Sequence, residues 1–234
     1  MHQVFVVCLL HFNLQYVAGG LNGLWASQGW PDDNDSIEDQ IIVQSFEPVL
    51  DLLKQHPTWG MDLEMQGYMV DVLAERHPDV LAELRDLADA GQVEIVSFHW
   101  SDQLWTAYPR HDEEVSLDLV ADSFARADLP LSKVVFTQEG QFSEGMLPVM
   151  AEHGYEVAVL PRNLATFWWG GPATSTLYEK DGVIVVPSNG LHSTDDSYEV
   201  QWAYFDDGEL LATNDENPYA GPYFVTSPAS IAAF

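Results

Sequence analysis

The sequence has 234 residues, of which 47% are hydrophobic and 12% aromatic, so it excludes a disordered polymer and suits one large α/β domain or two small ones. Its 37 Asp and Glu residues far outnumber its 8 Lys and Arg residues, and the formal net charge of -29 argues against nucleic acid or an anionic membrane as a partner. The single cysteine, Cys8, excludes an internal disulfide.

Short apolar runs alternate along the chain with amphipathic stretches of helical period, a pattern that predicts βα units and a parallel sheet. The expected strands are Val4–Leu10, Trp59–Leu63, Val93–Phe98, Val134–Thr137, Val157–Leu160, Val183–Val186 and Tyr223–Thr226. The expected helices are Ile37–Gln55, Tyr68–Glu75, Asp79–Ala90, Glu113–Ala127 and Glu144–His153. In the fourth of these helices we expect Val115, Leu119 and Phe124 to face inward.

We expect residues 1–234 to form a single domain that is cut short at its C-terminal end, because residues 227–231 resemble the start of an unfinished helix. Residues 163–222 are rich in Gly, Pro, aromatic residues and Asp, and long irregular segments of this kind are usually functional. The apolar run 4–10 is short and follows no Lys or Arg, so it predicts a buried strand and not a signal peptide.

The acidic residues are spread along the chain and are not gathered in blocks, which favours a salt-adapted fold over an interaction tail. Such a charge makes the compact state repel itself at low ionic strength. At about 1 M salt the Debye length falls to roughly 3 Å and most of the repulsion is screened. The sequence therefore predicts a halophilic protein of a cytoplasm at molar salt, with an ordinary acidic protein as the alternative.

Polar and titratable residues recur where the expected strands end, which is where parallel (β/α) barrels carry their chemistry. They are His11 and Asn13 after the first strand, Asp62 and Glu64 at the second, His99, Trp100 and Asp102 after the third, Gln138 and Glu139 after the fourth, Arg162 after the fifth, and Ser188, Asn189 and His192 after the sixth. Strand ends also become polar simply because the chain leaves the core there. The prediction of an active site therefore rests on the whole set of residues and not on any single position.

The segment Phe136-Thr137-Gln138-Glu139-Gly140 places a carboxylate at the tip of a buried strand, beside a glycine that lets the backbone turn sharply. Glycoside hydrolysis needs two carboxyl groups facing one sugar, about 5–5.5 Å apart for a covalent nucleophile and about 6.5–9.5 Å apart when water attacks directly. Glu139 is the candidate for one of these two groups.

This segment resembles the nucleophile motif of glycoside hydrolase family 57, Trp-Leu-Pro-Glu followed by a helix and a Gly-aromatic-apolar strand, although Phe136 replaces the Trp and Gln138 the Pro. Residues 87–95, Leu-Ala-Asp-Ala-Gly-Gln-Val-Glu-Ile, resemble a passage of family 57 and of the related family 38 α-mannosidases that leads to a His, here His99. His11-Phe12-Asn13 resembles the His-x-His or His-x-Asp start of those families. The resemblance covers residues 4–162.

The resemblance implies a distorted seven-stranded parallel (β/α) barrel that acts as a retaining glycoside hydrolase or glucan-modifying transferase on α-linked sugars, with Glu139 as nucleophile. The second carboxylic acid is an Asp farther along the chain in the family. Asp195 and Asp196 are the best candidates present, with Asp196 preferred, and an acid beyond residue 234 is the alternative. The sugar subsite would be lined by His11, Asn13, Glu64, His99, Trp100 and Arg162. Loop tryptophans would stack on sugar faces or close the edge of the core.

Two alternatives use the same barrel. A metal-dependent α-mannosidase or carbohydrate deacetylase would bring His11, Asn13, His99 and His192 to one mouth, but Asn13 stands where a stronger ligand is expected. We therefore expect neither metal nor cofactor. A non-catalytic carbohydrate-binding barrel is the other alternative. Because no phosphate-cradling, dinucleotide-binding or Gly-x-Ser-x-Gly motif occurs, ATPases, dinucleotide oxidoreductases and serine esterases are disfavoured.

Overall fold

The computed structural model describes residues 9–12, 14, 34–101, 103–136, 141–161 and 177–188. The chain divides into two compact units, one made of residues 1–12 and 58–198 and the other of residues 13–57 and 199–234. The expected strand Tyr223–Thr226 lies outside the described residues, as does most of Val4–Leu10. A single domain over residues 1–234 stays a prediction.

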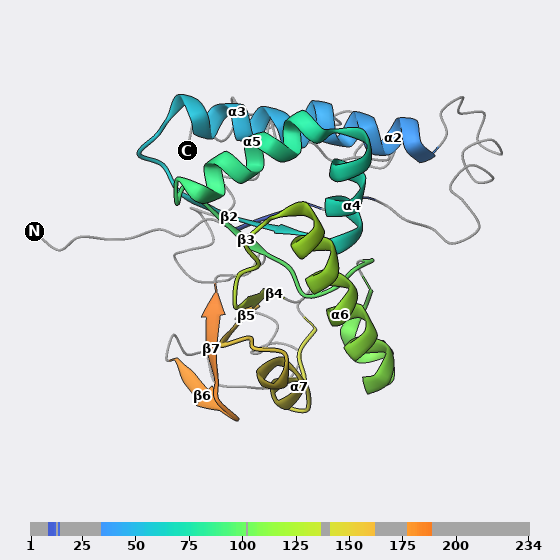
Figure 1. Ribbon diagram of the computed structural model, residues 1–234. Coiled ribbons are helices and arrows are strands. Elements are labelled where there is room, and N and C mark those ends of the chain that lie inside the picture. Colours follow the sequence, from blue (N-terminus) through green and yellow to red (C-terminus); the bar gives the residue numbers. More distant parts are fainter. Residues whose placement is uncertain are drawn as a thin grey trace, which may run out of the picture. The chain divides into compact units, whose positions relative to one another are not determined.

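The first sheet of the larger unit has three parallel strands in the order β1-β2-β3, as the alternating pattern predicts (Figure 1). The strands are β1 (Leu9–Phe12), β2 (Met61–Met65) and β3 (Val93–Val96). One face of this sheet is apolar and buried, with Leu10, Leu63 and Ile95 in register, all at most 5% exposed. Because side chains alternate along a strand, His11 and Glu64 lie on the opposite face.

Two helices follow β2 on the way to β3, which makes this crossover a βαβ unit (Figure 1). They are α4 (Gly67–Arg76) and α5 (Pro78–Asp89). Val80, Leu84 and Leu87 of α5 are buried, whereas Ala88 beside them is only half-buried. Gly91 ends this helix with a φ of 71°, a left-handed conformation that glycine adopts without strain.

The second sheet has the order β4-β5-β7-β6, in which β4 (Val134–Phe136), β5 (Val157–Pro161) and β7 (Val183–Ser188) are parallel. The strand β6 (Tyr178–Lys180) pairs with β7 antiparallel and was not expected from the sequence. Asp181 and Gly182 join them, with φ values of 54° and 82°. Both values are positive, as tight hairpin turns require. The α/β class is thus confirmed, and an entirely parallel set of strands is not what the described residues show.

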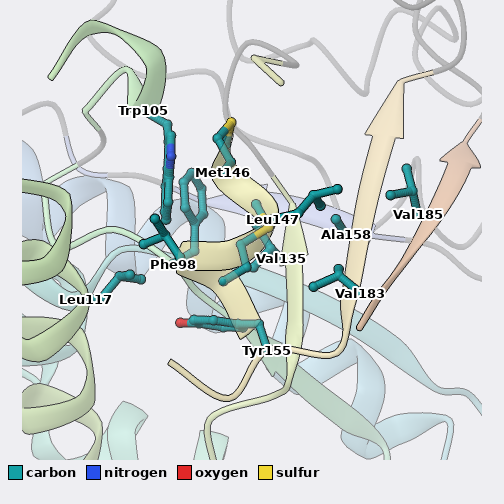
Figure 2. Packing of buried hydrophobic residues seen from close by; sticks show 12 residues of the cluster. Phe98, Trp105, Leu117, Val135, Met146, Leu147, Tyr155, Ala158, Val183 and Val185 are labelled. Atoms are coloured by element: carbon teal, nitrogen blue, oxygen red, sulfur yellow. The ribbon is translucent and has the colours of Figure 1, made fainter. Parts of the chain in front are cut away.

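The helices α6 (Arg110–Ala127) and α7 (Met146–Glu152) belong to the same unit. Figure 2 shows the core cluster in which Leu117 of α6 and Leu147 of α7 accompany side chains of the second sheet. Phe124 is buried as expected, but Val115 and Leu119 are 44% and 42% exposed, so their inward orientation was a wrong prediction. The buried face of α6 instead carries Glu113, Ser116, Leu117, Val120, Ser123, Phe124 and Ala127.

In the smaller unit, the expected helix Ile37–Gln55 is present but is not a continuous α-helix. It consists of α2 (Asn34–Ile41), a π-helix (Ile42–Phe46) and α3 (Glu47–Gln55). One side of this helical segment is buried, since all six of its apolar residues are at most 5% exposed: Ile41, Ile42, Phe46, Val49, Leu50 and Leu53. Among the described residues, no helix combines the length and apolar character that crossing a bilayer requires.

Candidate active site

His11, Glu64 and His99 form a compact cluster at the carboxyl ends of three neighbouring parallel strands. Register pairs His11 of β1 with Glu64 of β2, so the two side chains leave the same face of the sheet side by side. Nδ1 of His11 contacts Oε2 of Glu64, and Nε2 of His99 lies 3.3 Å from Oε1 of the same carboxylate. One carboxylate therefore serves two imidazole rings.

The three side chains of this cluster differ in how far they are buried. The side chains of Glu64 and His99 are 0% exposed, whereas that of His11 is 31% exposed. Burial alone would raise the pKa of Glu64, but the charges and hydrogen bonds of His11 and His99 outweigh it and hold that pKa below its usual value. Glu64 is thus an ionised carboxylate at neutral pH, and His11 is the member of the cluster that a solute can reach.

The segment after β3 is held in place on both sides of His99. The backbone N–H groups of Gly67 and Tyr68 donate to the carbonyl oxygens of His99 and Trp100, at 3.1 and 2.8 Å. On one side of His99, Phe98 enters the core cluster and stacks on Trp105, with ring centroids 5.0 Å apart (Figure 2). The ring of His99 meets that of Phe98 edge to face at 4.4 Å. A rigid core therefore positions a buried imidazole.

Trp100 is anchored on the other side, between α4 and α6. Its indole Nε1–H donates to Asp71 at 3.1 Å, and the same carboxylate accepts hydrogen bonds from Ser123 and Arg126 at 3.0 and 2.7 Å. A Cβ on Gly67 would lie 2.8 Å from the indole ring, so glycine is what admits Trp100 here. Because its N–H is already engaged, Trp100 has no N–H to offer a sugar hydroxyl, and its expected role in sugar binding stays a prediction.

The end of β4 lies next to this cluster. The ring of Phe136, the last residue of β4, has its centroid 6.4 Å from that of His11. The chain continues from Phe136 into residues 137–140, which lie outside the described residues and include Glu139. Asn13, Arg162, Asp195 and Asp196 also lie outside them. Their expected roles, like that of Glu139, stay predictions.

Glu113 is a buried titratable residue that the sequence reasoning missed. It lies in the first turn of α6, is 3% exposed, and interacts electrostatically with His99. Helical spacing was the signal that could have found it, because Glu113 precedes the buried Leu117 by four residues.

Within the described ranges, no three His, Cys, Asp or Glu residues form a group arranged to hold a metal ion. Asn13 and His192 of the metal-dependent alternative lie outside those ranges, so that alternative stays a prediction.

No protein-family model matches the chain. The 4-α-glucanotransferase of Thermococcus litoralis is 26% identical over 117 residues, which are 50% of this chain and 18% of that enzyme. An α-amylase of Pyrococcus abyssi is 23% identical over 124 residues, 53% of this chain and 19% of its own. The chain thus spans about a fifth of the length of these curated relatives.

Solved structures show the same fold. The Thermococcus litoralis 4-α-glucanotransferase superposes with a TM-score of 0.62 at 20% identity, covering 78% of this chain and 27% of that one. A GH57-type branching enzyme of Pyrococcus horikoshii gives 0.60 at 13% identity, covering 78% and 47%. A putative polysaccharide deacetylase of Mycobacterium smegmatis gives 0.54 at 14% identity, covering 97% and 69%. At these sequence identities the structural similarity shows a shared fold and nothing about a shared activity.

The chain therefore has an α/β fold that it shares with carbohydrate-active enzymes. Within that class, these comparisons confirm the resemblance to glycoside hydrolase family 57 that the motifs indicate. The relation to family 38 stays a prediction.

Proposed function

We propose that this chain carries the catalytic barrel of a retaining enzyme that acts on α-linked glucans, as a hydrolase or a transferase. The observation that carries the proposal is the His11–Glu64–His99 cluster at the carboxyl ends of β1 to β3, with the end of β4 beside His11. In (β/α) barrels this is the end at which substrates bind and react. The curated relatives, a 4-α-glucanotransferase and an α-amylase by name, support the choice of substrate.

In the proposed mechanism the Glu139 carboxylate attacks the anomeric carbon, and the bond from that carbon to the leaving sugar oxygen breaks. A carboxylic acid, with Asp196 as our candidate, gives its proton to that oxygen. The resulting carboxylate then takes a proton from water or from a sugar hydroxyl, whose oxygen displaces Glu139. Water gives hydrolysis, and a sugar hydroxyl gives transfer.

His11 would contact the bound sugar, since it is the exposed member of the cluster. Glu64 would keep the His11 ring oriented, and His99 would hold Glu64 from the buried side. An ionised carboxylate paired with an imidazole favours a protonated or Nδ1–H form of that ring. The sugar would thereby meet a ring of defined orientation, which favours a preorganised site.

We further propose that the described strands belong to a distorted seven-stranded barrel and that the protein works in a cytoplasm of high salt. The fold shared with the 4-α-glucanotransferase and the branching enzyme supports an α/β arrangement of this kind. The charge of -29 supports the salt adaptation.

The anomeric configuration of the first product tests the mechanism. We would follow the hydrolysis of an α-1,4-linked oligosaccharide by proton NMR in about 2–3 M KCl, where charge repulsion is screened. A retaining enzyme releases the α-anomer first, and mutarotation adds the β-anomer later. Initial release of the β-anomer would contradict a covalent intermediate on Glu139.

A further inference from the structure

Glu113 is a buried carboxyl group on the inner face of α6. Its side chain is 3% exposed, and neither carboxylate oxygen makes a hydrogen bond of ordinary geometry with the described residues. A buried carboxylate without such partners costs folding free energy. A residue of this kind on the wall of a candidate site therefore calls for a functional explanation.

The helical period places Glu113 against the segment that carries His99. Glu113 and Ser116 lie three residues apart on the buried face of α6, and the Ser116 hydroxyl accepts a hydrogen bond from the Trp100 N–H at 3.0 Å. The inner face of α6 is thus in direct contact with this segment. His99 and Gln103, which belong to it, are the groups that favour the charged form of Glu113.

The surroundings of Glu113 have opposing effects on its pKa. Burial raises the pKa of Glu113 to about 7, with a further contribution from Asp112 on the same helix, while His99 and the side chain of Gln103 act against the rise. At neutral pH the group therefore exists both as a carboxylic acid and as a carboxylate.

His99 consequently interacts with two carboxyl groups of different character. Glu64 is ionised and pairs with Nε2 of His99, at 3.3 Å, as well as with Nδ1 of His11. Glu113 is poised between its two forms. The four side chains make one sequence of interactions, His11–Glu64–His99–Glu113, which runs from the exposed ring on β1 to α6.

We propose that Glu113 is a positioning residue that sets the orientation and protonation state of His99 and, through Glu64, those of His11. Its action on the imidazole of His99 is independent of any activity. Its effect on catalysis rests on the proposed function, in which His11 contacts the sugar. Glu113 itself touches neither the sugar nor the reacting atoms.

The test compares the wild-type chain with Glu113→Gln, Glu113→Asp and a control, Glu75→Gln, which removes an exposed carboxyl from α4. The first readout is the nitrogen NMR shifts of the His99 ring between pH 5 and 9, assigned by their loss in His99→Gln. We expect Glu113→Gln to change the His99 shifts and move their titration, Glu113→Asp to restore them in part, and the control to leave them unchanged. Wild-type His99 shifts in a folded Glu113→Gln variant would overturn the proposal.

The second readout is turnover of an α-glucan. We expect Glu113→Gln to lower kcat by up to about 100-fold, the order of effect that a small misplacement of a reacting group produces, with KM changed less than kcat and a displaced pH profile. An unchanged kcat and pH profile in an active enzyme would overturn the catalytic part. If the wild-type chain has no turnover while His99 still responds to Glu113, the proposed function fails and the positioning role stands. Should Glu113→Gln not fold, Glu113→Asp alone decides, because its His99 shifts must then differ from wild type.

Discussion

Replacing Glu113 with glutamine should stabilise the folded chain at pH 8. The pKa of Glu113 rises from 4.5 to about 7 on folding, so the folded state holds a proton that the unfolded state has lost between these pH values. The free energy of unfolding of the wild type therefore falls as pH rises from about 4.5 to about 7 and is constant above. A shift of this size corresponds to at most about 3 kcal/mol. Glutamine, which never ionises, avoids this loss.

Urea denaturation at pH 5 and pH 8 in about 2 M KCl measures this difference. We expect Glu113→Gln to have nearly wild-type stability at pH 5 and to exceed it by about 1–3 kcal/mol at pH 8. The exposed control Glu75→Gln should show no such dependence on pH. A variant that is less stable than wild type at both pH values would mean that the fold requires the Glu113 carboxylate, and the reasoning would fail. A more stable but less active variant is the signature of a group kept for function.

Three further perturbations test the fold. Asp62→Asn should stabilise the chain above pH 6 but not at pH 4, because burial and Glu94 raise the pKa of Asp62 to about 6; equal thermal shifts at both pH values would contradict this. Gly67→Ala should cost about 1–3 kcal/mol in urea denaturation, since its Cβ would lie 2.8 Å from the Trp100 ring and 3.3 Å from Val120; a change below about 0.5 kcal/mol would show looser packing of α4 on α6. Raising KCl from about 0.1 to 2 M should raise the melting temperature, and a constant or falling one would argue against salt adaptation.

The parallel strands among the described residues could be predicted to within a few residues, because each is a short apolar run that alternates with amphipathic helices. The second strand was expected at Trp59–Leu63 and is found at Met61–Met65, so Glu64 belongs to the strand and does not follow it. The apolar pattern alone does not fix where this strand ends, since Met61, Leu63 and Met65 are all buried. In the structure, Glu64 and Met65 pair with His11 and Phe12 of β1, so the strand extends two residues beyond the expected end.

The hairpin strand β6 was missed because its side chains are polar or exposed, so no apolar run marks it. The Asp181-Gly182 pair was nevertheless a signal, since this dipeptide favours a two-residue hairpin turn. The π-helix Ile42–Phe46 left no signal in the apolar pattern, because its widened turn keeps Ile42 and Phe46 buried, as an α-helix also would.

The candidate site was partly predictable. Three of the residues expected at strand ends, His11, Glu64 and His99, do meet, because parallel strands bring their carboxyl ends to one edge. Glu113 was missed because the inward face of its helix was assigned from apolar residues, Val115 and Leu119. That face is polar at its first turns, where it meets the segment carrying His99, and local rules of this kind fail most often at functional sites.

The central claim is that the chain turns over α-linked glucans through a nucleophilic Glu139. The most direct measurement is the release of reducing ends or of transfer products from a panel of α-linked oligosaccharides in about 2–3 M KCl, where the charge is screened. It compares the wild type with Glu139→Gln and with the exposed control Glu75→Gln. We predict that the wild type and the control are active and that Glu139→Gln loses the activity. Turnover by Glu139→Gln at the wild-type rate would contradict the claim.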